Sequence, residues 1–316
     1  MDFQLTPLQE ELRDTTRKLC AGRFPIASSR AAEGRVDSAA WRDLTDAGVF
    51  SLRLPEEAGG LGLGTTDAAV VFEELGRGLV PGPLVWTHIA AGWDLGAEVV
   101  GGIERPAPDA PVLVEHLGDL GTLVVLDDDG VWAVELAALD ARPLRPFDPL
   151  TPVWHVAALP RGTKVGPADA AARARLDGAA LTAAVLAGLA AGVCELTVAY
   201  AKQRHQFGRP VGSFQAVKHA LADMVVRAEV ARVQAFAAAA HLDEPSLGDT
   251  ARAVSSAKVV ASDAAYANGK VAIQLHGGMG MTWEVDAHLY LKRARVLDDA
   301  FGNGDAHAEL VAARVG

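Results

Sequence analysis

With 316 residues, half of them hydrophobic, the chain can bury the core of one large domain or of two to three small ones. Its 29 lysines and arginines stand against 40 aspartates and glutamates. This net charge of −11 argues against nucleic acid as the main partner, although a few local arginines could still hold an anionic small molecule. The two cysteines, Cys20 and Cys194, lie far apart in helical patterns, so we expect no disulfide framework and a reducing, cytoplasmic environment.

The first 106 residues are predicted to form a helical domain. Thr6-Pro7 is typical of a helix start, because a proline stands just inside a threonine cap. The opening stretch, MDFQLTPLQEELRD, is acidic and amphipathic without an apolar run, so it predicts no signal peptide. The glycines of LRLPEEAGGLGLG (52–64) indicate a loop, and TTDAAVVFEELGRGL (65–79) predicts a helix capped by Thr65 or Thr66.

Residues 107–167 differ from this pattern and predict a small, reduced β domain. LVVLDDDGVWAV (123–134) has two apolar runs around Asp-Gly, which is a hairpin signal. WHVAAL (154–159) predicts another short strand, and the polar stretch 161–178 reads as a linker.

From residue 168 to 316 the pattern predicts a helical bundle, with helical segments at 177–204, 213–242, 248–275 and 284–298. The most apolar run, 179–194, is shorter than the ~18 residues expected of a membrane-spanning helix and is rich in alanine and glycine. We expect it to be a buried core helix.

The turn between the first two of these helices, RHQFGRPVGSFQ (204–215), carries more polar chemistry than a helix hairpin needs. Pro210 must leave the helix, and Ser213 is predicted to cap the next one. An arginine offers a planar fork to a phosphate and a phenylalanine offers a face to an aromatic ring. The candidate residues for holding a dinucleotide are Arg204, Gln206, Phe207 and Gln215. The alternative is a plain hairpin with a solvated arginine and an inward-packed phenylalanine.

A second segment, AIQLHGGMGMTWE (272–284), ends a helix at Gln274 and breaks it at Gly277-Gly278. Glycines here would let the backbone approach another group closely, whereas the simpler reading is a glycine helix cap. We expect His276 to be a loop histidine. The basic residues Lys292, Arg293 and Arg295 could equally meet a phosphate or form a solvated face.

Together these segments resemble the acyl-CoA dehydrogenase family of flavoproteins. RHQFGRPVGSFQAVKHALADM (204–224) and IQLHGGMGMTWE (273–284) resemble its two signatures, and LRLPEEAGGLGLG followed by FEELGRGL resembles its N-terminal loop and helix. The order and spacing agree over most of 1–105 and 168–316. The resemblance implies an N-terminal helical domain, a middle β domain and a C-terminal four-helix bundle.

The resemblance also implies an FAD that lies extended at a subunit interface, so an oligomer is expected. The family's arginine contacts the FAD pyrophosphate and its phenylalanine lies against the adenine. Carried onto this chain, the implied FAD-binding residues are Arg204, Gln206, Phe207, Gln215, Gln274, Gly277 and Gly278.

The chain departs from the family in two respects. Between residues 105 and 170 it has no Thr-Glu-Pro or Gly-Ser-Asp segment and no strand resembling Trp-Ile-Thr, so the half of the site that holds the isoalloxazine ring is degraded. The second departure is the base that removes the α proton of the thioester, a task for a carboxylate with a tuned pKa. Most members carry a glutamate before a glycine after the last long helix, where this chain has Phe301-Gly302.

A minority of members carry the base one helix earlier, where this chain has Asp263. At ~100° per residue, Asp263 and Gln274 fall within about 20° of each other on one helix face. Asp263 is therefore the only carboxylate we nominate as a catalytic residue. It is one methylene shorter than glutamate, which would displace the base by about an ångström. The alternative is a solvated helix aspartate. No His/Cys spacing suggests a metal.

Three hypotheses follow. In the first, the chain is one subunit of a heteromeric acyl-CoA dehydrogenase, resembling actinobacterial two-gene enzymes for bulky CoA thioesters such as steroid side chains. It would form a dimer or an α2β2 tetramer, with a partner that supplies the isoalloxazine pocket and the base. In the second, it is a silent helical subunit without flavin. In the third, it is a stand-alone homo-oligomeric dehydrogenase that uses Asp263. The acyl group and the electron acceptor are left open.

Overall fold

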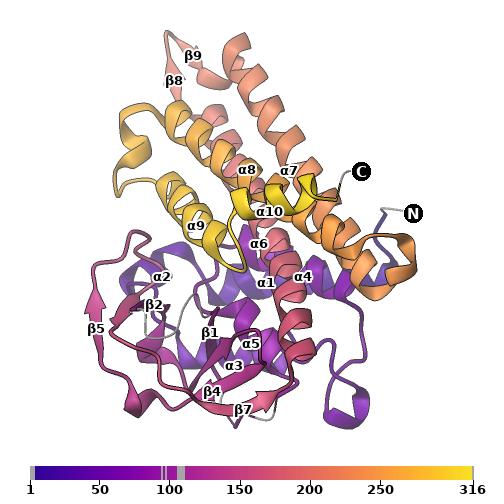
Figure 1. Cartoon of the computed structure of the whole chain (residues 1–316). Coiled ribbons are helices and arrows are strands. Elements are labelled where there is room, and N and C mark those ends of the chain that lie inside the picture. Colours follow the sequence, from indigo (N-terminus) through magenta and orange to yellow (C-terminus); the bar gives the residue numbers. More distant parts are fainter. Residues whose placement is uncertain (1–3, 94, 97, 105–110, 315–316) are drawn as a thin grey trace. The chain divides into compact units, whose positions relative to one another are not determined.

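The structure, a computed structural model, describes residues 4–93, 95–96, 98–104 and 111–314 (Figure 1). Its contacts divide the chain into two compact units. The helical unit consists of 1–26, 65–80 and 179–316, and the mixed unit of 27–64 and 81–178. Three domains with the boundaries expected from the sequence remain a proposal, and the expected boundary at 106/107 lies outside the described residues.

Among the described residues, the helical unit contains the four C-terminal helices predicted from the sequence, two N-terminal helices and a short seventh helix near the C-terminus. The helix α1 begins at Pro7 with the predicted cap: the Thr6 hydroxyl accepts from Gln9 N, and the Gln9 side chain accepts from Thr6 N. The helices are α1 (Pro7–Arg23), α4 (Thr65–Arg77), α6 (Ala168–Gln203, whose first turns belong to the mixed unit), α7 (Gln215–Asp243), α8 (Thr250–His276), α9 (Ala287–Asp299) and α10 (Gly304–Ala312).

The start of α4 corrects the sequence analysis, which expected Thr65 or Thr66 as its cap. Asp243, at the end of α7, accepts from Thr65 N at 2.6 Å and from Thr66 N at 2.8 Å and the Thr66 hydroxyl at 2.7 Å. Burial alone would raise the pKa of Asp243, but the hydrogen bonds from Thr66 and Thr65 hold it below its ordinary value. A distant carboxylate therefore supplies the cap and the favourable charge at the helix N-terminus.

Small residues let α4 and α6 approach closely. A Cβ at Gly188 would clash with the carbonyl oxygen of Glu73, and a Cβ at Gly76 would clash with that of Val185. The two helices therefore cross backbone to backbone. One buried side chain ties three helices: Asn268 Nδ2 donates to the carbonyls of Ala190 on α6 and Met224 on α7.

The apolar run at 179–194 lies in α6, as predicted for a core helix. By length and composition α6 could cross a membrane, but 83% of its apolar window is buried inside the structure. Such burial is typical of the core helix of a soluble protein.

The mixed unit holds two sheets with a shared apolar core. The order of the first sheet is β1-β3-β4-β7, with β1 parallel to β3, and the order of the second is β2-β6-β5. Side chains of both sheets meet in one cluster that includes Val114, Val125, Trp132 and Val156. The strands are β1 (Val100–Glu104), β2 (Val112–Glu115), β3 (Thr122–Leu126), β4 (Val131–Val134), β5 (Ala141–Leu144), β6 (Val153–Val156) and β7 (Thr163–Gly166); the helices of this unit are α2 (Ile26–Ala31), α3 (Ser38–Asp46) and α5 (Leu84–Ala90).

The hairpin predicted around Asp-Gly is confirmed, since β3 and β4 pair antiparallel with Leu126 opposite Val131. The strand predicted at 154–159 is confirmed over 154–156, as β6. The linker predicted at 161–178 was wrong, since this stretch forms β7 and the first turns of α6. The strand β1 corrects the sequence analysis, which assigned residues up to about 105 to helices. Its two central glycines hide the strand pattern, and they are required here: a Cβ at Gly102 would collide with the ring of Trp86.

Candidate functional site

The first motif forms an exposed arm at the end of α6. The strands β8 (His205–Gln206) and β9 (Arg209–Pro210) pair antiparallel around Phe207-Gly208. Both turn residues have positive φ, 53° and 76°, as a two-residue type I′ hairpin requires. The Phe207 side chain is consequently 91% exposed. This contradicts the inward-packed phenylalanine of the plain-hairpin alternative.

A cation and a second ring accompany Phe207. Its ring meets that of Phe214 edge to face at 6.1 Å, and the guanidinium of Arg209 lies 4.1 Å from the centre of the Phe214 ring. Arg204 and Gln206 are exposed on the same arm. The sequence analysis did not nominate Arg209, although the second arginine of the motif is visible in the sequence.

The start of α7 differs from the prediction for Ser213. That residue lies in a short 3-10 turn (Val211–Ser213), and α7 begins at Gln215 after Phe214, which makes no side-chain cap. Gln215 is exposed at the first position of α7, beside backbone N–H groups that a helix start leaves unpaired. This end of the helix is therefore open to an acceptor.

The second motif ends α8. Gly277 caps the helix with φ of 64°, and its N–H donates to the carbonyl of Gln274, whose side chain is exposed. A Cβ at Gly277 or Gly278 would meet nothing within 4 Å, so the backbone here faces open space. Gly280 is the glycine that packing requires, because a Cβ there would clash with the carbonyl of Ile273.

The structure brings the two motifs together at one end of the helical unit (Figure 1). The ring of Tyr200, one turn before Arg204, stacks on His276 at 4.1 Å, and its hydroxyl donates to the His276 carbonyl at 3.4 Å. His276 is thus the buried last residue of α8, which corrects its reading as a loop histidine. Its Nδ1 lies 2.7 Å from the carbonyl oxygen of Ala272.

This surface has the chemistry of a site for the adenine and pyrophosphate half of a dinucleotide. Arg204 and Arg209 supply fixed positive charge for phosphates, the exposed Phe207 ring supplies a stacking face, and Gly277-Gly278 leaves backbone free for close approach. The residues present therefore fit FAD as the resemblance implied. Among the residues that the structure describes, no three His, Cys, Asp or Glu side chains are grouped to hold a metal ion.

The loop where most family members carry the base is built around other residues. Phe301 and Gly302 both have positive φ, and the Gly302 carbonyl accepts from the buried Lys258 ammonium at 2.8 Å. His307 Nε2 lies 2.8 Å from the Phe301 carbonyl oxygen. Burial, with the charge of Lys258, holds the pKa of His307 below its ordinary value. Backbone contacts hold this loop, and its residue at the position of the base is the buried Phe301, not a carboxylate.

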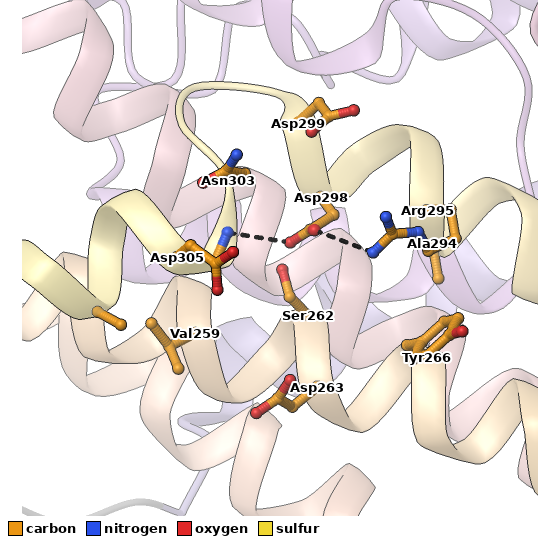
Figure 2. A pocket seen from close by; sticks show the side chains of 12 residues that line it. Val259, Ser262, Asp263, Tyr266, Ala294, Arg295, Asp298, Asp299, Asn303 and Asp305 are labelled. Atoms are coloured by element: carbon orange, nitrogen blue, oxygen red, sulfur yellow. Dashed lines mark hydrogen bonds and ion pairs between the residues drawn. The ribbon is translucent and has the colours of Figure 1, made fainter.

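Asp263 lies on α8 in a pocket between α8, α9 and α10, of about 360 Å³ (Figure 2). Eleven residues separate it from Gln274, or about 16 Å at ~1.5 Å per residue, so the two side chains share a helix face but stand three turns apart. Its role as a base stays a prediction.

The three basic residues of α9 named in the sequence analysis, Lys292, Arg293 and Arg295, have different surroundings. Arg293 is buried and donates to the carbonyl of Val80 at 3.2 Å. The Lys292 ammonium lies 5.6 Å from the ring of Trp283, and Arg295 extends over Tyr266 beside the pocket. Neither of the two predicted roles, contact with a phosphate or a solvent-exposed basic face, describes all three residues.

Comparison with known proteins agrees with this geometry. Residues 6–98 match the family described as acyl-CoA dehydrogenase, N-terminal domain, and residues 170–316 match acyl-CoA dehydrogenase, C-terminal domain. Acyl-CoA dehydrogenase IpdE2 of Mycobacterium tuberculosis is 37% identical over 315 residues, covering 92% of each chain. Acyl-CoA dehydrogenase FadE34 of the same organism is 35% identical over 93% of this chain, which matches only 45% of FadE34.

Solved structures share the fold at low sequence identity. The ChsE4-ChsE5 complex from Mycobacterium tuberculosis superposes with a TM-score of 0.85 at 22% identity, covering 100% of this chain and 99% of that chain. Butyryl-CoA dehydrogenase from Megasphaera elsdenii superposes with a TM-score of 0.83 at 18% identity, covering 100% of both chains. The chain therefore belongs to the acyl-CoA dehydrogenase family, whose enzymes are FAD-dependent oxidoreductases that act on CH–CH bonds.

Proposed function

We propose that this chain is one subunit of a heteromeric acyl-CoA dehydrogenase that catalyses α,β-dehydrogenation of a CoA thioester. The observation that carries the proposal is an imbalance within the helical unit. The residues that fit the adenine and pyrophosphate of FAD lie on an exposed arm, whereas the loop at the position of the family's usual base has the buried Phe301 in place of a carboxylate. A partner would then supply the isoalloxazine pocket and the base.

The division of labour follows from the side chains present. Bound FAD supplies the hydride acceptor for the β carbon of the acyl group. In this chain Arg204 and Arg209 would neutralise the pyrophosphate, and the exposed ring of Phe207 would offer a stacking face to the adenine. Because the arm is exposed on its own subunit, it can reach a cofactor that is shared with a neighbouring chain.

The comparisons support an assembly of this kind. One solved structure of the same fold is a complex of two named chains, ChsE4 and ChsE5, and another is described as a steroid ACAD with a two-part name, Tcur3481-Tcur3483. We propose an α2β2 tetramer and a bulky, steroid-derived acyl-CoA as substrate, which places the enzyme in lipid or steroid catabolism. Closed symmetry is the common arrangement for such subunits.

The experiment that tests the proposal is an absorbance spectrum of the chain purified alone and after co-expression with a full-length family member. Yellow protein only with the partner supports the heteromeric subunit. Yellow protein from the chain alone indicates the stand-alone enzyme that uses Asp263, and colourless protein in both cases indicates a silent subunit. Each outcome selects one of the three hypotheses.

A substitution locates the cofactor contact in that assembly. Arg204→Ala removes charge-assisted bonds of about 1.5–3 kcal/mol and should lower flavin retention, and Arg204→Lys should restore it only in part because a point charge replaces a fork. Arg252→Ala is the matched control, because Arg252 is an exposed arginine in the first turn of α8, at the other end of that helix from Gly277. Equal flavin content in Arg204→Ala and Arg252→Ala would show that Arg204 does not contribute to FAD binding.

A further inference from the structure

We propose that the pocket between α8, α9 and α10 binds an organic cation, an alkylammonium or guanidinium group, at a site separate from the exposed arm of β8 and β9. The pocket has a volume of about 360 Å³. Its polar lining comes from all three helices and the loop between α9 and α10, and consists of Ser262, Asp263, Tyr266, Arg295, Asp298, Asp299, Asn303 and Asp305 (Figure 2).

The charges of this lining do not balance. Arg295 lies 3.5 Å from Asp298 Oδ2, and Asp298 Oδ1 accepts from Gly304 N at 3.2 Å, so the charge of Asp298 is matched. Within the described part of the chain, Asp263, Asp299 and Asp305 have no ion-pair partner, and each lines the same pocket. All three side chains are exposed at the rim of the pocket, and this excess of negative charge favours a positively charged occupant.

An independent feature at the same place is a buried hydroxyl. Ser262 is 7% exposed, and its Oγ has no hydrogen-bond partner among the described residues. Figure 2 shows this hydroxyl directed into the pocket, on the side where Asp298 lies. A buried polar atom without a partner is unfavourable, and a donor placed in the pocket would satisfy it.

The size and the ligand set favour an organic cation over a metal ion. No group of three or more potential metal ligands occurs among the residues that the structure describes. The volume suits an extended group that spans several carboxylates rather than a bare ion. An ammonium or guanidinium group in the pocket can donate to Ser262 Oγ, and the nearby carboxylates favour its positive charge. Such a group can come from a free polyamine or from a basic side chain of a neighbouring chain.

Titration calorimetry with spermidine at low ionic strength tests the site, because screening is then weakest. We expect saturable binding to the purified chain. Ser262→Ala should weaken it about tenfold, since a hydrogen bond to a charged group is lost. Asp263→Asn should weaken it about threefold, the range of an exposed ion pair. The matched control Asp223→Asn removes an exposed carboxylate of α7 outside the pocket and should leave binding unchanged.

The unliganded Ser262→Ala protein provides a second readout. It should melt at or above the temperature of the wild type, because the substitution removes an unsatisfied buried hydroxyl. If Ser262 had only a structural role, its substitution would not weaken spermidine binding while leaving the melting temperature unchanged or higher. Lower stability together with unchanged binding would overturn the role of Ser262.

Titration of the assembled oligomer distinguishes the two sources. If spermidine binds the assembly as it binds the isolated chain, the site is open to a free amine. If assembly abolishes binding and Asp263→Asn weakens subunit association, a basic side chain of the neighbouring chain fills the pocket. The proposal is overturned if spermidine binds neither form and the variants leave assembly unchanged, or if Asp223→Asn weakens binding as much as Asp263→Asn does.

Discussion

Phe207→Ala should separate cofactor binding from folding more cleanly than any other substitution in this chain. The ring is 91% exposed, so about a tenth of its ~200 Å² is buried, and its removal should cost about 0.5 kcal/mol of stability at ~25 cal/mol per Å². Alanine would occupy the same left-handed backbone conformation as phenylalanine, so the strain of the turn is unchanged.

The effect on the flavin should be much larger than the effect on folding. Stacking of an aromatic ring on a base is worth about 1–3 kcal/mol, which corresponds to roughly a 5- to 150-fold weaker FAD affinity in the assembled enzyme. Urea unfolding measures the stability and fluorescence titration of the apoenzyme measures the affinity, with Phe207→Tyr as the control that keeps the ring. An alanine variant that binds FAD within twofold of the wild type, or that loses more than about 2 kcal/mol of stability, would refute the reasoning.

The remaining predictions concern the base and the fold. Asp263→Asn should leave the kcat of the heteromeric enzyme largely intact, and a fall of about 100-fold with the fold preserved would assign the base to this chain. Asp243→Ala should lower the free energy of unfolding by about 1–2 kcal/mol at pH 7. Because the pKa of Asp243 is lower in the folded protein, its contribution to stability is fully present above the ordinary value of 3.8 and is lost as the pH falls through the folded pKa. The free energies of unfolding of variant and wild type, measured in urea, should therefore converge in acid. Gly188→Ala should destabilise by about 3 kcal/mol or more on thermal unfolding, whereas Gly22→Ala, which meets no atom, should not.

Features determined by neighbours in the sequence could be predicted. The capping pair of Thr6 and Gln9 lies three positions apart in the sequence. The hairpin at Asp127–Gly130 depends on a turn between two adjacent apolar runs. The long helices follow from apolar periodicity. In each case the interacting groups lie within a few residues of one another, so the pattern contains the cause.

Features determined by distant partners could not be predicted. The cap of α4 is Asp243, which lies 178 residues after Thr65, and a threonine at the helix start gave a plausible but wrong alternative. The buried amide of Asn268 meets carbonyls 78 and 44 residues away. Nothing in the local sequence distinguishes these side chains from solvated ones.

The candidate site likewise has parts that the sequence predicts and parts that depend on distant contacts. The motif residues around Arg204 and Gly277 were identified from their order in the chain, but their proximity rests on the contact of Tyr200 with His276, which no motif specifies. The pocket around Ser262 has no sequence signature at all, because its carboxylates come from three helices and its serine looks like a helix-interior residue.

The contrast between buried and exposed polar groups supports the proposal that this chain acts with a partner. Inside the helical unit, Asn268 and Lys258 are fully buried and both donate to backbone carbonyls, so these polar groups serve the fold. The residues fit for FAD show the opposite arrangement. Arg204 and Gln206 are exposed, and Phe207 presents almost its whole ring to solvent on a turn of strained backbone conformation. Folding of this chain gains little from that arm. Its conformation would be useful where a second surface covers the ring and a phosphate meets the arginines, as in the proposed sharing of the cofactor between subunits.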